Sequence, residues 1–123
     1  MSFTYSFERL EIWQLARQLT REIYRITDMF PESEKFGLTS QLRRSSISVA
    51  SNIAEGNHRE SRKHRLVFSQ IAFSSLMEVL NQLIIANDLS YLSEEELSHI
   101  RNLIEQLGNK LNSYYNYQKL HIR

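Results

Sequence analysis

Residues that interrupt helices are scarce in this sequence, whose 123 residues include one proline and three glycines. Inside a helix, proline costs about 3 kcal/mol and glycine about 1 kcal/mol relative to alanine. So few of them argue against an all-β or loop-rich fold, which needs many turns. We therefore expect long helices, and the length is that of one domain over residues 1–123.

Apolar residues recur at steps of three and four, which places them on one face of a helix. This spacing predicts helices over about residues 7–27, 38–55, 61–88 and 94–117. The stripe of the first predicted helix consists of Trp13, Ala16, Leu19, Ile23 and Ile26. Helices joined by short connections pack as antiparallel neighbours, so we predict an all-α, antiparallel up-down-up-down four-helix bundle.

Several residues mark where the predicted helices end. A proline follows Phe30 and disfavours helical geometry there, and we expect Phe30 and Phe36 to cover that end of the bundle. Gly56 is placed to cap the second helix at its C-terminus. Ser93, followed three residues later by Glu96, forms the sequence pattern of a capping box. We expect the tail after about residue 117 to be frayed.

The third predicted helix is more apolar than one buried face requires. Fifteen of the 24 residues from Leu66 to Leu89 are apolar and spread around most of the helix. Either this helix is central to the bundle or its outer face contacts another subunit. No stretch approaches the roughly 20 apolar residues of a membrane span. The first residues lack the pattern of a signal peptide, so we expect a cytoplasmic protein.

Known catalytic and metal-binding patterns are poorly matched. The absence of cysteine excludes disulfides, thiolate metal sites and thiol catalysis. Two Glu-x-x-His strings, Glu55 to His58 and Glu96 to His99, have the spacing found in half of a di-iron site. Gly56 interrupts the first, and the capping box occupies Glu96. The sequence carries no phosphate-binding loop or nucleophile elbow. We predict no metal, no cofactor and no enzymatic activity.

Glu55 and Glu78 are the carboxylates with the most apolar sequence surroundings. A buried pair of carboxylates is able to perform acid–base chemistry. The alternative is structural, because a buried acid must accept hydrogen bonds or pair with a cation. We favour the structural interpretation for both.

Charge is segregated along the chain although the net charge is only +1. Residues 35–65 carry seven basic and two acidic side chains, whereas residues 66–100 carry five acidic ones and no lysine or arginine. The densest positive cluster consists of Arg59, Arg62, Lys63 and Arg65. The last three of these fall near the N-terminus of the third predicted helix, where the dipole disfavours positive charge and backbone N–H groups suit a phosphate.

Three interpretations of this cluster stay open: contact with nucleic acid, a solvated turn, and pairing with an acidic protein surface. We favour nucleic acid, bound mainly through its backbone. Arg43 and Arg44 are candidates to extend the positive surface, although they lie roughly three helical turns from the end of the second helix.

Three strings in order give the sequence a recognisable signature: FERLEIWQLA from Phe7, FGLTSQLRRS from Phe36, and SVASNIAEG from Ser48. They resemble the 23S rRNA intervening-sequence protein family, also called four-helix bundle proteins. The resemblance extends from about Phe7 to Leu111. At Phe73 and Ser74 the chain departs from the pattern, since many members carry a basic residue and glycine there.

The resemblance implies a four-helix bundle that assembles into a homo-oligomeric ring, usually a pentamer. The family is also similar to the accessory variability determinant of diversity-generating retroelements, which binds nucleic acid and a reverse transcriptase. Asn52, Glu55 and Gly56 match the family's end of the second helix, and we interpret them as structural. The expected partners are other copies of the chain together with RNA or DNA, or alternatively another protein, with no membrane.

Overall fold

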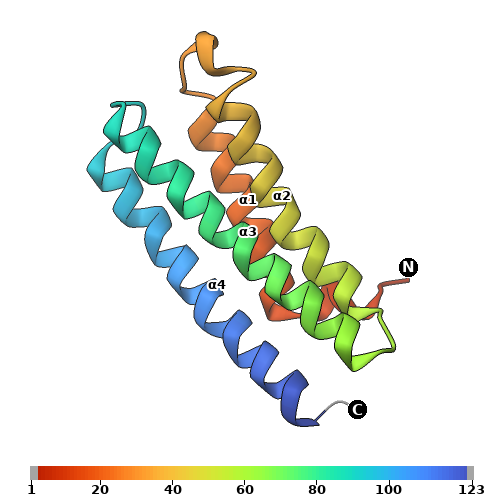
Figure 1. Ribbon diagram of the computed structural model, residues 1–123. Helices are drawn as coiled ribbons and strands as arrows, with labels where there is room; N and C mark the ends of the chain where they lie inside the picture. The colour runs from red at the N-terminus through yellow and green to blue at the C-terminus, as the bar shows by residue number, and fades with distance from the viewer. Residues whose placement is uncertain (1–2, 122–123) are drawn as a thin grey trace.

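The computed structural model describes residues 3–121, which form four long helices with two short 3₁₀ helices, and no strand occurs in this range (Figure 1). The elements in chain order are η1 (Ser6–Arg9), α1 (Glu11–Thr27), η2 (Glu32–Glu34), α2 (Leu38–Asn57), α3 (Arg62–Asp88) and α4 (Glu94–His121). Helix α1 packs on α2 and α4, and α3 packs on the same two helices from the opposite corner. The predicted all-α four-helix bundle is confirmed.

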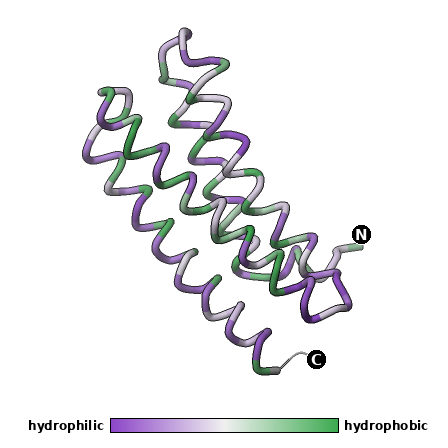
Figure 2. The backbone as a smooth tube through the Cα atoms, viewed as in Figure 1, coloured by the Kyte–Doolittle hydropathy of each residue, from purple (hydrophilic) through white to green (hydrophobic). Residues whose placement is uncertain are grey.

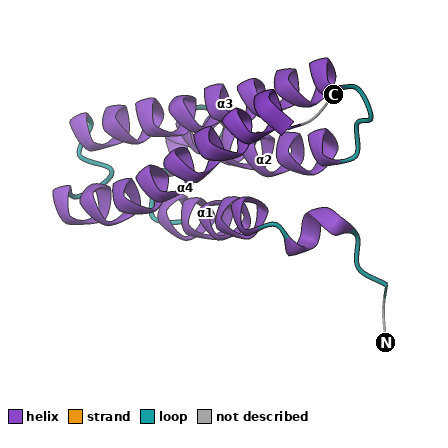
Figure 3. Ribbon diagram, turned by 90° about the horizontal axis from the view of Figure 1, so that it is seen from below, coloured by secondary structure: helices purple, strands orange, loops and turns teal. Residues whose placement is uncertain are grey.

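The helices alternate in direction, so the bundle has two different ends. The N-terminal segment, the loop between α2 and α3, and the last turns of α4 lie at one end in both views (Figures 1 and 3). The α1–α2 and α3–α4 loops lie at the other end. The topology therefore brings both ends of the described chain to the same end of the bundle as the loop that contains the basic cluster.

The core is made of the apolar stripes of all four helices. Their most buried members include Ala16, Leu19, Ile23, Leu42, Val49, Leu76, Val79, Leu83, Ile100 and Leu107, each 0% exposed. The predicted stripe of α1 is confirmed, with Trp13 half-buried at its edge. Ser93 accepts a hydrogen bond from the Glu96 backbone N–H at 3.1 Å, so the predicted N-cap of α4 is also confirmed.

Helix α1 begins later than predicted. The sequence predicted one helix from residue 7, but residues 6–9 form a separate 3₁₀ turn, and Leu10 is extended. The Glu8 carboxylate accepts a hydrogen bond from the Tyr5 backbone N–H at 2.8 Å, which closes the 3₁₀ turn. This local bond makes η1 a unit of its own, and α1 starts at Glu11.

Helix α4 continues beyond the predicted end. The expected frayed tail is helical to His121, while residues 122–123 lie outside the described range. The reason is tertiary: Gln118 is 1% exposed, and its Oε1 accepts a hydrogen bond from the Ser69 hydroxyl of α3 at 2.7 Å. A tail with a buried anchor on another helix gains the contacts that a frayed tail lacks.

The end of the bundle near the α1–α2 loop is covered by one of the two predicted phenylalanines. Phe30 is buried and lies 5.7 Å from the Tyr91 ring, centroid to centroid. Phe36 is 90% exposed, with the Lys35 ammonium 5.6 Å from its ring centroid. The prediction was therefore correct for Phe30 and wrong for Phe36.

Gly56 has a different role from the one predicted. Helix α2 continues through it to Asn57, and no glycine in the described chain has a positive φ. A Cβ at Gly56 would lie only 2.7 Å from the Phe68 Cβ of α3. Gly56 therefore does not cap the helix; it allows the backbones of α2 and α3 to approach.

Helix α3 keeps an apolar outer surface in the single chain. Its exposed large apolar residues are Val67, Ile71, Met77, Ile84 and Ile85, and exposed Leu89 directly follows the helix. Within the described range, α3 is the one helix long and apolar enough to span a membrane by length and composition. The core helix of a water-soluble bundle satisfies the same criterion, and Leu76, Val79 and Leu83 of α3 are fully buried against the other helices.

Candidate functional site

The basic turn, residues 57–65, connects α2 to α3 and is mostly hydrophilic (Figure 2). Ser61 is the N-cap of α3, and its side chain accepts the His64 backbone N–H at 3.4 Å. Arg62 and Lys63 are consequently the first two residues of the helix, at the positive end of its dipole. The structure thus places these two cations where the sequence analysis predicted them.

The four cations of the basic turn fall into two pairs. The Arg59 guanidinium lies 4.9 Å from the Phe68 ring centroid, and Arg65 Nε donates a hydrogen bond to the Arg59 carbonyl. Arg62 and Lys63 are exposed. Across residues 3–120, none of the four lies at ion-pair distance from a carboxylate. The turn therefore carries positive charge that no ion pair among the described residues neutralises.

Asn57 fixes the base of the turn to the rest of the bundle. Its Nδ2 donates to the Ser6 hydroxyl at 2.7 Å, and its Oδ1 accepts from the Tyr114 hydroxyl of α4 at 3.3 Å. Burial raises the pKa of Tyr114, so this hydroxyl stays protonated and remains a donor well above neutral pH. The basic turn thus starts from a point held by three elements.

Arg43 is not part of the positive surface around the turn. Its Nε donates to the Thr27 hydroxyl at 2.9 Å, and its terminal nitrogen contacts the Asp28 carboxylate at 3.0 Å. Its guanidinium also lies 4.4 Å from the Tyr24 ring centroid. These contacts join the end of α1 to α2. Arg44 is exposed, but about 13 helical residues, or roughly 20 Å, separate it from the end of α2.

These neighbouring arginines allow a matched stability test. Arg43→Ala is expected to lower the free energy of unfolding by about 1–2 kcal/mol, because buried Thr27 loses a hydrogen-bond donor and Asp28 loses its cation. Arg44→Ala is expected to change it by less than about 0.5 kcal/mol. Chemical denaturation of both variants gives the comparison. Equal losses would contradict the anchoring role of Arg43.

The residues interpreted as structural differ in burial. Glu55 and Glu78 are exposed despite their apolar neighbours in the sequence, and they do not form a buried acid–base pair. Glu78 accepts a hydrogen bond from Gln82 at 3.0 Å, and Gln82 in turn accepts one from Ser45 of α2 at 2.9 Å. Asn52 donates to the Ser48 carbonyl of its own helix at 2.8 Å.

Glu96 and His58, one member of each Glu-x-x-His string, make contacts of other kinds. Glu96 receives two hydrogen bonds from Arg25 at 3.0 Å each, and this contact lowers the pKa of Glu96. His99 is largely exposed, and His58 packs against aromatic rings. No group of three or more histidine, aspartate or glutamate residues suited to a metal occurs among the residues that the structure describes.

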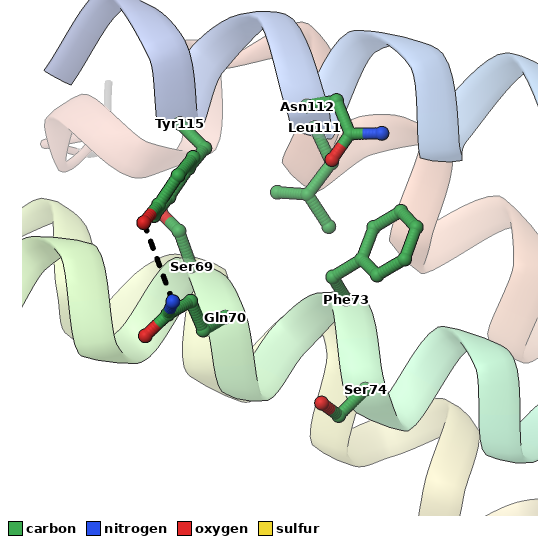
Figure 4. Close-up of a pocket in the computed structure, with 7 residues that line it drawn as sticks. All are labelled: Ser69, Gln70, Phe73, Ser74, Leu111, Asn112 and Tyr115. Atoms are coloured by element: carbon green, nitrogen blue, oxygen red, sulfur yellow. Dashed lines mark hydrogen bonds between the residues drawn. The ribbon is translucent and has the colours of Figure 1, made fainter. Parts of the chain in front are cut away.

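A groove between α3 and α4 lies on another face of the bundle (Figure 4). Phe73 and Leu111 form its apolar wall, and Gln70 donates a hydrogen bond to the Tyr115 hydroxyl at 3.3 Å. Ser69, Ser74 and Asn112 complete the lining. No carboxylate, histidine or cation lines this groove, so it offers no acid–base pair. Phe73 and Ser74, the two positions at which the chain departs from the family pattern, both line this groove.

An aromatic cluster beside the basic turn was not predicted from the sequence. The aromatic ladder, as we name it, consists of Phe3, Tyr5, Phe7 and Trp13. Successive ring centroids lie 4.8, 6.5 and 5.1 Å apart. His58 of the turn packs edge-on against Tyr5 and Phe7. The alternation of Phe3, Tyr5 and Phe7 was the available signal, but only the tertiary structure brings these rings to the turn.

Comparison with known proteins agrees with this architecture. The model of the 23S rRNA-intervening sequence protein family matches residues 8–113. The chain belongs to this family. A solved structure described as a protein of unknown function from the S23 ribosomal protein family of Bacteroides thetaiotaomicron superposes with a TM-score of 0.77. The two share 21% identity over 85% of this chain and 95% of that one, a likeness that shows the shared fold. No curated protein matches the sequence.

Membership in the 23S rRNA-intervening sequence protein family accounts for most of the chain but assigns no chemistry to individual residues. The matched range includes α1 to α3 and most of α4, and it contains the whole basic turn. Phe3, Tyr5 and Phe7 precede it. Three of the four rings of the ladder are therefore features of this chain that the family match does not cover.

Proposed function

We propose that this family member is a non-catalytic, cytoplasmic, homo-oligomeric bundle that binds the backbone of nucleic acid through its basic turn. The observation that carries the proposal is the unneutralised charge of Arg59, Arg62, Lys63 and Arg65 at one end of the bundle. A phosphate backbone is the common cellular ligand for such a cluster.

The position of Arg62 and Lys63 on α3 favours a phosphate over a solvated turn. Cations at a helix N-terminus are unfavourable by some tenths of a kcal/mol, and a protein without an anionic ligand gains nothing from them. Helix α4 shows the favourable arrangement, with three glutamates in its first turn. A bound phosphate would satisfy both the side chains and the free backbone N–H groups of α3.

The homo-oligomer, pentameric by the resemblance described above, is supported by the outer surface of α3. Exposed Val67, Ile71 and Ile85 recur on one side of that helix, outside the core of the single chain. Exposed apolar stripes of this kind are typical of surfaces that contact another subunit. A ring would also repeat the basic turn, which multiplies the charge offered to one nucleic acid.

The salt dependence of binding tests the proposed function. Fluorescence anisotropy of labelled RNA and DNA is measured at about 50 and 200 mM salt, together with the mass of the protein in solution. Four phosphate contacts give a slope of log affinity against log salt near −3, and a loss of roughly 50-fold between the two conditions. Affinity that is absent at low salt, or unchanged by salt, would contradict the proposal. A monomeric mass would contradict the oligomer.

The second candidate function is a scaffold that contacts only proteins. Here the basic turn pairs with acidic residues of another protein. A second copy of this chain is one candidate partner, because its residues 66–100 carry five acidic side chains and no lysine or arginine. This alternative predicts salt-sensitive self-association without binding of RNA or DNA. The same two measurements therefore separate it from the first proposal.

A further inference from the structure

A groove runs from the basic turn along the boundary between α1 and α2. Its first part, a hollow of about 420 Å³, is lined by Phe7, Ala54, Glu55, His58 and Arg59. Its second part, of about 510 Å³, also contains Phe7 and Ala54 and continues to Trp13, Arg17 and Arg21. The two parts share these two residues and therefore adjoin.

Cations stand at both ends of this groove, and aromatic rings lie between them. Arg59 stands at the end next to the turn, while Arg17 and Arg21 stand at the far end. The ring of Phe7 lies between them and contacts both His58 and Trp13. The Arg17 guanidinium lies 5.5 Å from the Trp13 ring centroid. Glu55 is the one carboxylate in the lining.

The aromatic ladder extends this lining to the surface. Phe3 is 77% exposed and Tyr5 is 56% exposed, although both are large rings that gain from burial. Neither is needed to fill the core, since the buried cluster is complete without them. Tyr5 contacts the basic turn directly, because its ring lies edge-on to His58 at 5.9 Å between ring centroids.

We propose that the ladder and the groove bind single-stranded nucleic acid, with unpaired bases stacked on the rings and phosphates held by the flanking arginines. This inference rests on the proposed function and specifies its substrate. Proteins that bind single strands combine a positive groove with aromatic platforms, because every base has a face that stacks. In a duplex the bases stack on each other, and the rings gain no contact.

Trp13 supplies a direct measurement, because it is the one tryptophan of the chain and lies in the groove. The probe is an unlabelled oligouridine strand of roughly 12 nucleotides, a length typical of single-strand sites. We expect this strand to quench Trp13 fluorescence. A duplex with the same number of phosphates, and a strand with abasic sites in place of bases, are expected to leave the fluorescence nearly unchanged.

The affinity test uses the double variant Phe3→Leu/Tyr5→Leu, which keeps apolar side chains but removes two aromatic faces. We expect it to weaken binding of the strand by about tenfold or more and to change binding of the duplex by less than about twofold. Phe36→Leu is the matched control: this exposed phenylalanine belongs to the α1–α2 loop, which lies at the opposite end of the bundle (Figure 1), and the variant should bind like the unmodified protein.

The outcomes distinguish the ladder from the turn. If the ladder variant binds the strand as tightly as the unmodified protein does, or if duplex and strand bind equally well, the ladder proposal is overturned and backbone binding by the turn stands. If the ladder variant instead changes only the mass of the protein in solution, the rings contact another subunit, and the proposal is also overturned. If no nucleic acid binds at all, the ladder proposal and the proposed function both fail.

Discussion

Replacing Gly56 with alanine will lower the free energy of unfolding by about 1–2 kcal/mol, even though alanine is the better helix former. A Cβ at this position would overlap Phe68 Cβ at 2.7 Å, against an ordinary contact of 3.4–4 Å. The clashing atom is next to the backbone of α3, so no rotamer change relieves it. The two helices must separate, and overpacking of this kind typically costs about 1–3 kcal/mol.

Gly108 of α4 provides the matched control within the same chain. It is also buried and helical, but a Cβ there would meet Leu76 Cδ2 at 3.6 Å and Phe73 Cε2 at 3.8 Å, which are ordinary contacts. Gly108→Ala should therefore raise stability by up to about 1 kcal/mol through helix propensity. Thermal or chemical denaturation of the two variants compares them directly. Gains at both positions would show that α2 and α3 have room to move apart without loss.

Neutralising the two free cations of the basic turn is expected to weaken nucleic-acid binding by roughly tenfold to a hundredfold at low salt. In the variant Arg62→Gln/Lys63→Gln, two phosphate contacts are lost. The slope of log affinity against log salt should therefore become less negative by about 1.4 to 1.8. Both side chains are exposed, so the fold should be unaffected. Arg59 and Arg65 are left in place because they contact Phe68 and the turn backbone.

The control for total charge is the variant Arg44→Gln/Arg101→Gln. These arginines are exposed, have no ion-pair partner among the residues described, and lie on α2 and α4 away from the turn. Both double variants remove two positive charges. If binding depends on the location of the charge, the control should lose less than about threefold and keep most of the salt slope. Equal losses would mean that net charge, and no local site, governs binding.

Some properties followed from the sequence because they depend on neighbours along the chain. The apolar stripe of α1 and the N-cap at Ser93 are set by spacings of three and four residues, which hold in any helix. The basic turn was identifiable for the same reason, since its four cations lie within seven residues. The local pattern, however, did not foresee the break at Leu10, which follows a 3₁₀ turn closed by hydrogen bonds in both directions between Tyr5 and Glu8.

Other properties depended on residues that are distant in sequence. Arg43 and Arg44 are adjacent and alike in the sequence, yet the first is held by Thr27 and Asp28 while the second faces solvent. Glu78 has apolar neighbours in sequence but lies on the exposed side of its helix. Helical periodicity tells which residues share a face, but it does not tell which face another helix covers.

The scarcity of helix breakers determined by itself that the chain folds into a few long helices, because backbone preference acts residue by residue. Tertiary structure decided what the rare glycines do. The position of Gly56 in the sequence predicted a cap, but the closeness of Phe68 makes it a contact point between α2 and α3. Packing of one helix on another is non-local, and for that reason the sequence predicted the helices but not the meeting of the aromatic ladder with the basic turn.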